Sequence, residues 1–430
     1  MKINNLYLIT LFFGCWLILL TCKRDQPSSK IVEHPDSLDS ILNHYVDNGY
    51  YPFLYARLEN KAGELLYEYS AVNEELLPGL TINGDSWIRI WSMSKIVTIS
   101  LLLDLVEDDI LQLHDPVTKY IPEFKELQVA VSKEGIPLAK LPSDSLESAC
   151  PYDLVDLDSV MTVLHLINHQ AGFYYATTNI PCLDSMLAEK NLPTAKNSEE
   201  LIDRLAEMPL IQHPGGTYFY GTNTTVLGLV AERATEKSLN QLVKEHITDP
   251  LQIEGLQYNL PEEAQLPPRI SGRDTILRKA HPGELDIFGP DVPDYVPEHE
   301  LYLGGEGMVA TAEGYADFLR MLLNGGRLNG YRFLNETTVK EMYAPQTQLT
   351  IPCLHYGYTL WVSSDSMRVN GTGDGGLWIG GGYEGTHFWV DPHREFVGVV
   401  MTQMFWVQPE GYEKDNDFRK AIYQTLLKNG

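Results

Sequence analysis

The sequence predicts an α+β fold in which an antiparallel sheet, flanked by helices, is interrupted by a large helical domain. Short apolar runs typical of strands stand near both ends of the chain, and helical patterns dominate from about 96 to 285. A chain of 430 residues can bury a large core, as one two-lobed unit or as two domains. We place the folded body at 38–430, with its sheet part at about 38–91 and 286–430 and its helical part at about 92–285.

The body is expected to open with a helix and a hairpin. Apolar residues recur at helical spacing over 38–46. The runs 53–58 and 65–69 are rich in apolar and aromatic residues, and 61–63 has the composition of the turn between them. A further extended run at 87–90 leads into the next helix.

Helix-capping patterns mark the central part of the chain. Asn197 is followed three residues later by Glu200, and Ser238 by Gln241, and each pair precedes an apolar run of helical period. The stretch 126–160 carries several Ser, Pro and Asp residues, so we expect an irregular excursion there.

The C-terminal part returns to strands after one clear amphipathic helix. Thr311 is expected to cap this helix, and the glycine pair at 325–326 to end it. The runs 386–390 and 396–401 predict two strands joined by a turn at Asp391. Strands at both ends with helices between them put the start of the helical part, near Ser92, at the seam of the two parts.

The N-terminus has the layout of an export signal. Lys2 precedes an apolar run over 6–20, which is short for a spanning helix and ends just before Cys22. We predict a signal peptide at 1–22 and a polar tether at 23–37. Leu19-Leu20-Thr21-Cys22 resembles the lipobox of bacterial lipoproteins, which implies lipidation of Cys22 and a membrane anchor. A plain signal peptide and an uncleaved anchor are the alternatives, and each places the body outside the cytoplasm, in the periplasm or at the cell surface.

The net charge limits the possible binding partners, and the cysteines bear on disulfide and metal sites. The formal net charge of −26 repels nucleic acid and anionic lipid headgroups, so neither is expected to bind the folded body. Cys15 lies in the export segment, which leaves Cys150, Cys182 and Cys353 in the body. Cys150 and Cys182 could pair in an oxidising compartment, or all three could be buried thiols, and their spacing predicts no metal site.

Ser92 and Lys95 are the leading catalytic candidates. A spacing of three in a helix puts the hydroxyl and the amine on one face, one turn apart. The continuation over 96–106 is apolar nearly all round, so the helix and Lys95 should be buried. Burial is expected to lower the pKa of Lys95, so that its neutral amine could take a proton from Ser92. The alternative is a helix cap followed by a surface lysine.

Two further segments could complete a site. The loop 214–223 begins with Pro-Gly-Gly and could bring the Tyr220 phenol to the Ser92 and Lys95 pair for proton transfer. The glycine-rich segment 375–386 runs into a strand, and a backbone N–H there could form an oxyanion hole with the N–H of Ser92. The alternatives are an aromatic loop that covers the core and a bulged, tightly packed strand.

Taken together, these segments resemble the serine β-lactamase and penicillin-binding-protein superfamily, in its class C-like branch that includes family VIII carboxylesterases. The resemblance covers roughly 40–425 and implies a β-lactamase-like fold. The similar segments are 85–95, 113–124, 162–173 with its His-x-x-Gly landmark, Tyr220-Gly221 with 226–228, 304–308 and 385–403.

The resemblance implies a role for each site residue. Ser92 would be the acylated nucleophile, Lys95 its base partner and Tyr220 the second proton-transfer group. The oxyanion and substrate-binding positions would be the backbone N–H groups of Ser92 and Tyr383 together with Gly381, Gly382 and Asn223.

Two departures from the family pattern bear on the substrate. Thr222 occupies the third place of the Tyr-x-Asn pattern, with Asn223 one residue later. Gly380-Gly381-Gly382 stands where β-lactamases and peptidases carry Lys-Thr-Gly, so the cation that binds a substrate carboxylate is missing there. We therefore rank hydrolysis or acyl transfer of carboxylic esters above D-amino-acid peptide or β-lactam hydrolysis.

Other readings stay open at this point. His165 and His169 stand four residues apart and could ligate zinc, but the Glu of the metalloprotease signature is absent. A lipoprotein that binds a peptide or glycan on the same scaffold without catalysis is the alternative of another class. The preferred prediction is an exported serine hydrolase that needs no cofactor and acts on a small-molecule ester or amide; the oligomeric state is not predicted.

Overall fold

The computed structural model describes residues 38–176, 179–273, 276–285, 287–293, 295–297, 299–347, 354–364, 371–373, 375–406, 411 and 413–425. The predicted signal peptide at 1–22 with Cys22, the tether at 23–37 and Cys353 lie outside these residues. Within them, no helix combines the length and the apolar character that a membrane crossing needs.

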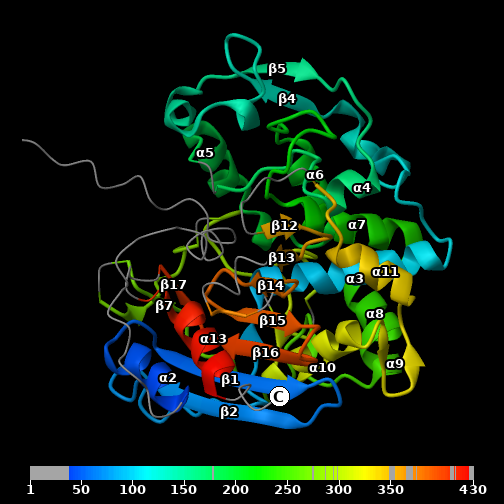
Figure 1. The fold of residues 1–430 in the computed structure, drawn as a ribbon. Helices are drawn as coiled ribbons and strands as arrows, with labels where there is room; N and C mark the ends of the chain where they lie inside the picture. Colours follow the sequence, from blue (N-terminus) through cyan, green and yellow to red (C-terminus); the bar gives the residue numbers. More distant parts are fainter. Residues whose placement is uncertain are drawn as a thin grey trace, which may run out of the picture.

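A seven-stranded sheet forms the lower part of the described structure, in the order β12-β13-β14-β15-β16-β1-β2 (Figure 1). Every neighbouring pair is antiparallel, and the N-terminal hairpin joins the C-terminal strands where Tyr55 stands opposite Met401. The strands are β1 (Phe53–Asn60), β2 (Leu65–Val72), β12 (Leu354–Tyr356), β13 (Trp361–Ser363), β14 (Trp378–Gly381), β15 (His387–Asp391) and β16 (Phe396–Met401). The predicted hairpin and the two predicted C-terminal strands are confirmed.

Helices cover both faces of the sheet. On the face turned to the viewer in Figure 1, α2 (Leu38–Asp47) contacts α13 (Lys414–Thr425) and both hairpin strands. On the other face α10 (Ala312–Leu323) packs against β16 and β1. The Thr311 side chain accepts from the Gly314 N–H, so the predicted cap of α10 is confirmed. The predicted α+β class is therefore confirmed.

The middle of the chain forms a mainly helical region above the sheet and to its right in Figure 1. Both predicted caps are present there, because Asn197 accepts from the Glu200 N–H and Ser238 forms a full capping box with Gln241. The helices of this region are α4 (Val163–Ile167), α5 (Pro181–Lys190), α6 (Ser198–Ala206), α7 (Asn223–Thr235), α8 (Leu239–Val243), the π-helix η8 (Lys244–Thr248) and α9 (Asp249–Leu251). Short 3₁₀ turns are η3 (Val117–Lys119), η4 (Pro122–Glu126), η5 (Leu138–Lys140), η6 (Ser143–Ser148) and η7 (Leu192–Thr194).

The stretch 126–160 is less irregular than predicted. It contains β4 (Gln128–Val131) and β5 (Asp153–Asp156), which pair antiparallel. All four residues of β5 are exposed, so the apolar alternation that reveals a strand in sequence is missing. Whether the body divides at 92 and 285 into two parts stays a prediction.

Smaller elements surround the start of the central helix. The strand β3 (Ile88–Arg89) is shorter than the predicted run and pairs with β9 (Val309–Ala310), which also pairs with β6 (Leu256–Gln257). The 3₁₀ turn η2 (Trp91–Met93) follows β3 and continues into α3 (Ser94–Glu107), which is buried along most of its length. The remaining elements are β7 (Ile270–Ser271), β8 (Arg278–Lys279), β10 (Arg327–Leu328), β11 (Tyr331–Arg332), α11 (Glu336–Tyr343) and β17 (Met404–Phe405).

Cys150 and Cys182 form a disulfide, with their Cα atoms 6.0 Å apart. Of the two possibilities left open by the sequence, pairing is therefore the one observed for these cysteines. The bond connects the end of the η6 segment to the start of α5, within the helical region.

Candidate active site

The candidate nucleophile lies at the junction of β3 and α3. Ser92 is half-buried in η2, and the Ile90 N–H before it donates to the Met308 carbonyl at 3.2 Å. Trp91 has a φ of 47°, which a bulky side chain rarely adopts. The chain thus makes a constrained turn immediately before Ser92, of the kind that persists only where neighbouring groups fix it.

The central one of those neighbouring groups is Glu384, in the segment after β14. The buried Trp91 indole donates to Glu384 at 2.9 Å, and Glu384 also accepts from Arg269 and Gln403. Sequence patterns gave no sign of this network, because its members lie far apart in the chain and Glu384 looks like an ordinary turn residue. The buried network fixes the Trp91 side chain and with it the turn that presents Ser92.

Lys95 is 1% exposed, and its ammonium lies among oxygen atoms. It donates to the Gly305 carbonyl at 2.9 Å and to the hydroxyls of Ser92 and Tyr175 at 3.3 Å each. A Glu306 carboxylate oxygen is 3.5 Å away. Ser92 and Lys95 are therefore adjacent, and the surface-lysine alternative is wrong.

The predicted lowering of the Lys95 pKa is also wrong. Burial alone would lower it, but the electrostatic influence of the nearby Tyr220 oxygen and Glu306 carboxylate outweighs burial, so the pKa of Lys95 lies above its usual value. Lys95 is thus an ammonium at neutral pH. The sequence shows that Lys95 is buried but not that a buried carboxylate, Glu306, lies beside it.

Tyr220 completes the group. Its hydroxyl donates to Ser92 Oγ at 2.8 Å, and its ring centroid is 5.0 Å from Lys95 Nζ. A Cβ at Gly221 would lie only 1.8 Å from the Phe173 carbonyl, so the loop can take this path only with glycine there. The loop 214–223 therefore holds Tyr220 over the other two residues, in the place that the family resemblance implied.

Buried groups behind Tyr220 hold it in place. The His169 ring stacks on the Tyr220 ring at 4.7 Å, and its Nδ1 accepts from the Gly221 N–H and lies 3.2 Å from the Asn223 amide nitrogen. Burial and the Lys95 charge hold the pKa of His169 well below its usual value, so the imidazole is neutral. Asn223, predicted to bind substrate, is instead fully buried at the start of α7 and supports His169.

The two histidines considered as zinc ligands have separate roles. His165 accepts from the Thr162 N–H in the capping box of α4, whereas His169 contacts Tyr220. Among the described residues, one cluster has the spacing of metal ligands, and it consists of Asp104, Asp108 and His246. Neither His165 nor His169 belongs to it.

The predicted oxyanion segment lies against the nucleophile turn. A Cβ at Gly382 would come within 2.5 Å of the Ile90 carbonyl, so glycine permits this approach. The Tyr383 ring contacts the Trp91 ring edge-on at 5.5 Å. Gly381 ends β14 opposite His387. The placement of Tyr383 beside the turn agrees with a role for its N–H at the oxyanion, which stays a prediction.

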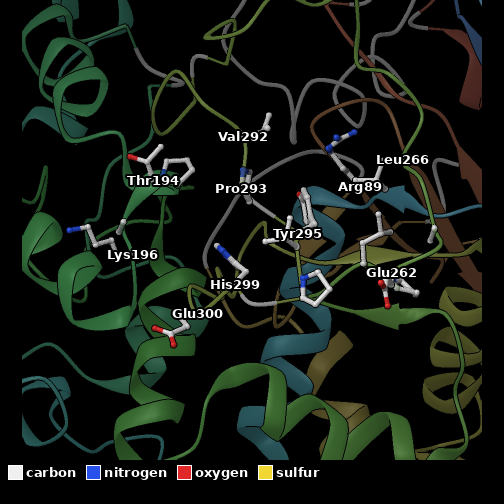
Figure 2. Close-up of a pocket in the computed structure, with 17 residues that line it drawn as sticks. Arg89, Thr194, Lys196, Glu262, Leu266, Val292, Pro293, Tyr295, His299 and Glu300 are labelled. Carbon is white, nitrogen blue, oxygen red and sulfur yellow. The ribbon is translucent and has the colours of Figure 1, made fainter.

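A pocket of about 990 Å³ opens beside β3, the strand that leads to Ser92 (Figure 2). Arg89 and Tyr295 line one side of it, and Thr194 and Lys196 lie across from them. The Arg89 guanidinium is 5.7 Å from the Tyr295 ring centroid, and the buried Tyr295 hydroxyl has no hydrogen-bond partner among the described residues. The pocket is large enough for a small molecule, and its charged lining is mixed, with Arg89, Lys196 and His299 beside Glu262 and Glu300.

Comparison with known proteins is consistent with this geometry. Protein Rv1367c of Mycobacterium tuberculosis is 28% identical over 265 residues, which is 61% of this chain and 60% of that relative's length. ML-236A carboxylate methylbutanoyltransferase mlcH of Penicillium citrinum is 25% identical over 379 residues, 81% of this chain and 83% of the relative.

The solved structure of EstCE1, a hydrolase with promiscuous acyltransferase activity, has the same fold. Its TM-score is 0.72 at 18% identity, covering 90% of this chain and 97% of EstCE1. The family model described as Beta-lactamase matches residues 60–421, which include every candidate site residue from Ser92 to Tyr383. The chain therefore belongs to the Beta-lactamase family.

Proposed function

We propose that this protein is a serine esterase or acyltransferase that forms an acyl-enzyme on Ser92. The observation that carries the proposal is the convergence of three side chains from separate segments, with Ser92 Oγ accepting from Tyr220 at 2.8 Å and from Lys95 at 3.3 Å. A nucleophile in contact with one proton-transfer group, Tyr220, and with a cation that can stabilise negative charge on it, Lys95, is an arrangement suited to acyl transfer. Relatives named as an acyltransferase and as a hydrolase with acyltransferase activity support the same chemistry.

The proposed first step begins once Tyr220 has released its own proton to solvent, so that its phenolate oxygen is the base. As Ser92 Oγ forms a bond to the ester carbonyl carbon, its proton moves to Tyr220, and the carbonyl oxygen becomes an oxyanion. The N–H groups of Ser92 and Tyr383 would stabilise this oxyanion. The C–O bond to the leaving alcohol then breaks, and Tyr220 returns the proton to that oxygen. The Lys95 ammonium stabilises negative charge on Tyr220 throughout.

The second step uses the same groups in reverse. Water or an alcohol gives a proton to Tyr220 and attacks the acyl carbon, and Ser92 leaves with that proton restored. Water as acceptor gives hydrolysis, whereas an alcohol gives acyl transfer.

The lack of a cationic side chain in β14 favours esters over penicillin-like substrates. Gly380 and Gly381 pair with Phe388 and His387, in the stretch where a carboxylate-binding lysine would stand. No cation comes from this strand, so a β-lactam carboxylate would lack its usual partner there.

The test is covalent labelling of the full chain, purified in detergent. Intact mass should show one fluorophosphonate adduct on the wild type and none on Ser92→Ala. Ester, D-amino-acid peptide and cephalosporin substrates, each with and without an added alcohol, would then identify the acyl donor and acceptor. A folded wild type that takes no adduct would favour a non-catalytic binding protein.

We further propose export and lipidation at Cys22. The sequence of 1–22 supports this, and the Cys150–Cys182 disulfide is of a kind that forms in oxidising compartments. Metabolic labelling with an alkyne fatty acid should mark the wild type but not Cys22→Ala. Equal labelling of both would contradict the lipid anchor.

A further inference from the structure

Glu306 is a buried carboxylate in direct range of the catalytic lysine. It is 3% exposed, and its Oε1 lies 3.5 Å from Lys95 Nζ. Its Oε2 accepts from the Thr225 hydroxyl at 2.5 Å. Burying an unpaired carboxylate costs free energy of folding, so packing alone does not explain a glutamate at this buried position.

The turn that carries Glu306 is fixed against two helices. The Gly304 carbonyl accepts from Thr98 of α3 at 2.6 Å, and the Gly305 N–H donates to Thr225 of α7 at 3.3 Å. A Cβ at Gly305 would come 2.9 Å from the Thr225 hydroxyl oxygen and 3.2 Å from Lys95 Nζ, so glycine lets the turn approach the lysine closely. Glu306 is thereby held beside Lys95 by the fold itself.

The other groups that face Lys95 differ from Glu306 in charge. They are the hydroxyl of Tyr175, the phenols of Tyr220 and Tyr356, and His169, which is neutral. Among the described residues that face Lys95, Glu306 is thus the carboxylate that can balance its charge. Burial raises the pKa of Glu306 and the Lys95 ammonium opposes that rise, as expected of a mutually dependent pair.

We propose that Glu306 is a positioning residue that keeps Lys95 as an ammonium during the reaction, so that the Ser92 proton passes to Tyr220 and not to Lys95. The inference rests on the proposed function and adds a division of labour within its site. Without the carboxylate, the buried ammonium would have no counter-charge and would lose its proton at a lower pH. Lys95 could then no longer stabilise negative charge on Tyr220.

The test is the pH dependence of Ser92 labelling by a fluorophosphonate, measured by intact mass between pH 5 and 10. Wild type should keep its labelling rate up to the alkaline end, whereas Glu306→Gln should lose it about one pH unit or more earlier. Glu306→Gln preserves the volume and an acceptor for Thr225. Glu306→Asp keeps the charge and should label as fast as wild type at alkaline pH. Thr225→Val also leaves the Glu306 charge in place, so the pH dependence of its labelling rate should differ little from that of wild type.

The outcomes separate the possibilities. Superimposable profiles for wild type and Glu306→Gln would overturn the inference, and so would faster labelling of Glu306→Gln at low pH, the signature of Lys95 as base. No labelling of wild type at any pH would instead contradict the proposed function.

A second measurement covers the case in which Glu306→Gln does not fold. In wild-type protein with ¹³Cε-labelled lysine, the Lys95 signal, assigned by its loss in Lys95→Arg, should keep its ammonium position to about pH 10. Deprotonation of Lys95 near neutral pH would overturn the inference.

Discussion

Tyr220 donates a 2.8 Å hydrogen bond to Oγ of Ser92 across 128 residues of sequence. Tyr220→Phe removes the proposed base and keeps the ring that stacks on His169. We expect kcat for p-nitrophenyl butyrate to fall by roughly 10² to 10⁴. Tyr175→Phe is the matched control, since it removes a hydroxyl that contacts only Lys95 in this group, and its loss should stay below about tenfold. Equal losses would argue against Tyr220 as base.

Ser92→Ala should lower kcat by roughly 10⁶ if Ser92 is the nucleophile. Its Oγ accepts two hydrogen bonds and is half-buried, so removal should leave the fold intact. Steady-state kinetics together with thermal unfolding would check both statements. Residual turnover within about tenfold of wild type would remove Ser92 from the mechanism.

We predict that the pocket beside β3, which none of Ser92, Lys95 and Tyr220 lines, takes up the acyl chain of the substrate, and that Arg89 there favours anionic esters. Arg89→Gln should raise KM for p-nitrophenyl hemiglutarate about tenfold and change KM for neutral p-nitrophenyl butyrate little, because a charged hydrogen bond is lost only with the anionic ester. Arg89→Lys serves as the charge-retaining control. A parallel change for both esters would indicate a structural effect.

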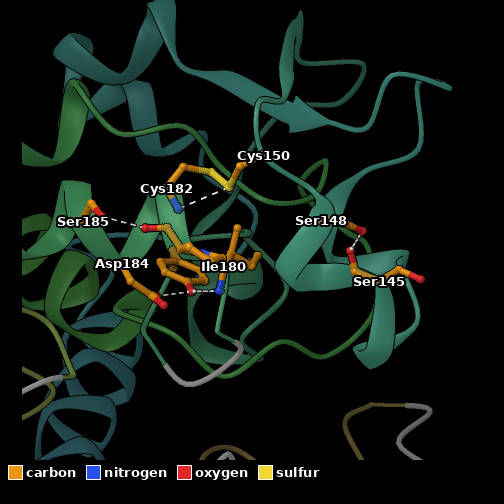
Figure 3. The surroundings of a disulfide bond; sticks show 9 residues. Ser145, Ser148, Cys150, Ile180, Cys182, Asp184 and Ser185 are labelled. Carbon is orange, nitrogen blue, oxygen red and sulfur yellow. Dashed lines mark hydrogen bonds between the residues drawn. A yellow bond between two sulfur atoms is a disulfide. The ribbon is translucent and has the colours of Figure 1, made fainter. Parts of the chain in front are cut away.

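The Cys150–Cys182 disulfide should stabilise the helical region. In Figure 3, Ile180 and Asp184 lie next to the bond, and Tyr174 bonds to both: the Ile180 N–H donates to its hydroxyl, which donates to Asp184 at 2.6 Å. A bond that closes a loop of 32 residues contributes about 2 to 4 kcal/mol to the free energy of unfolding. Denaturant unfolding of a Cys150→Ser, Cys182→Ser double variant would measure this, and an unchanged midpoint would contradict it.

Buried His387 should make the protein sensitive to acid. Burial lowers the pKa of His387 to about 4, with Asp415 opposing this and Arg419 and Lys414 reinforcing it. The unfolded chain therefore binds a proton between about pH 6.5 and 4 that the folded chain does not, so stability falls as the pH falls through this window. The contribution is at most about 3 kcal/mol. Urea unfolding at pH 7 and 4.5 should show a smaller loss for His387→Gln than for wild type.

The features that could be predicted from the sequence are those that depend on residues close together along the chain. The hairpin, the caps of α6, α8 and α10 and the placement of Ser92 and Lys95 follow from local periodicity and capping chemistry. The family resemblance then placed Tyr220, because no local rule says that a loop 128 residues away reaches Ser92.

Pairing between buried charged groups that lie far apart in the sequence could not be predicted in the same way. The Lys95 pKa depends on Glu306, 211 positions further along the chain, and the sequence shows only a glutamate among glycines. The Trp91 turn depends on Glu384, which contacts it only after β14 and β15 have paired. The strand β5 was missed because its four residues are all exposed.

The pairing of β1 with β16 also sets the timing of folding during synthesis. The edge of β1 that receives β16 has no partner until more than 330 further residues have been made, roughly half a minute at ordinary translation rates. An apolar strand with an open edge is a site of aggregation during that interval. A truncation before Phe396 should therefore yield insoluble protein even though it keeps Ser92, Lys95 and Tyr220.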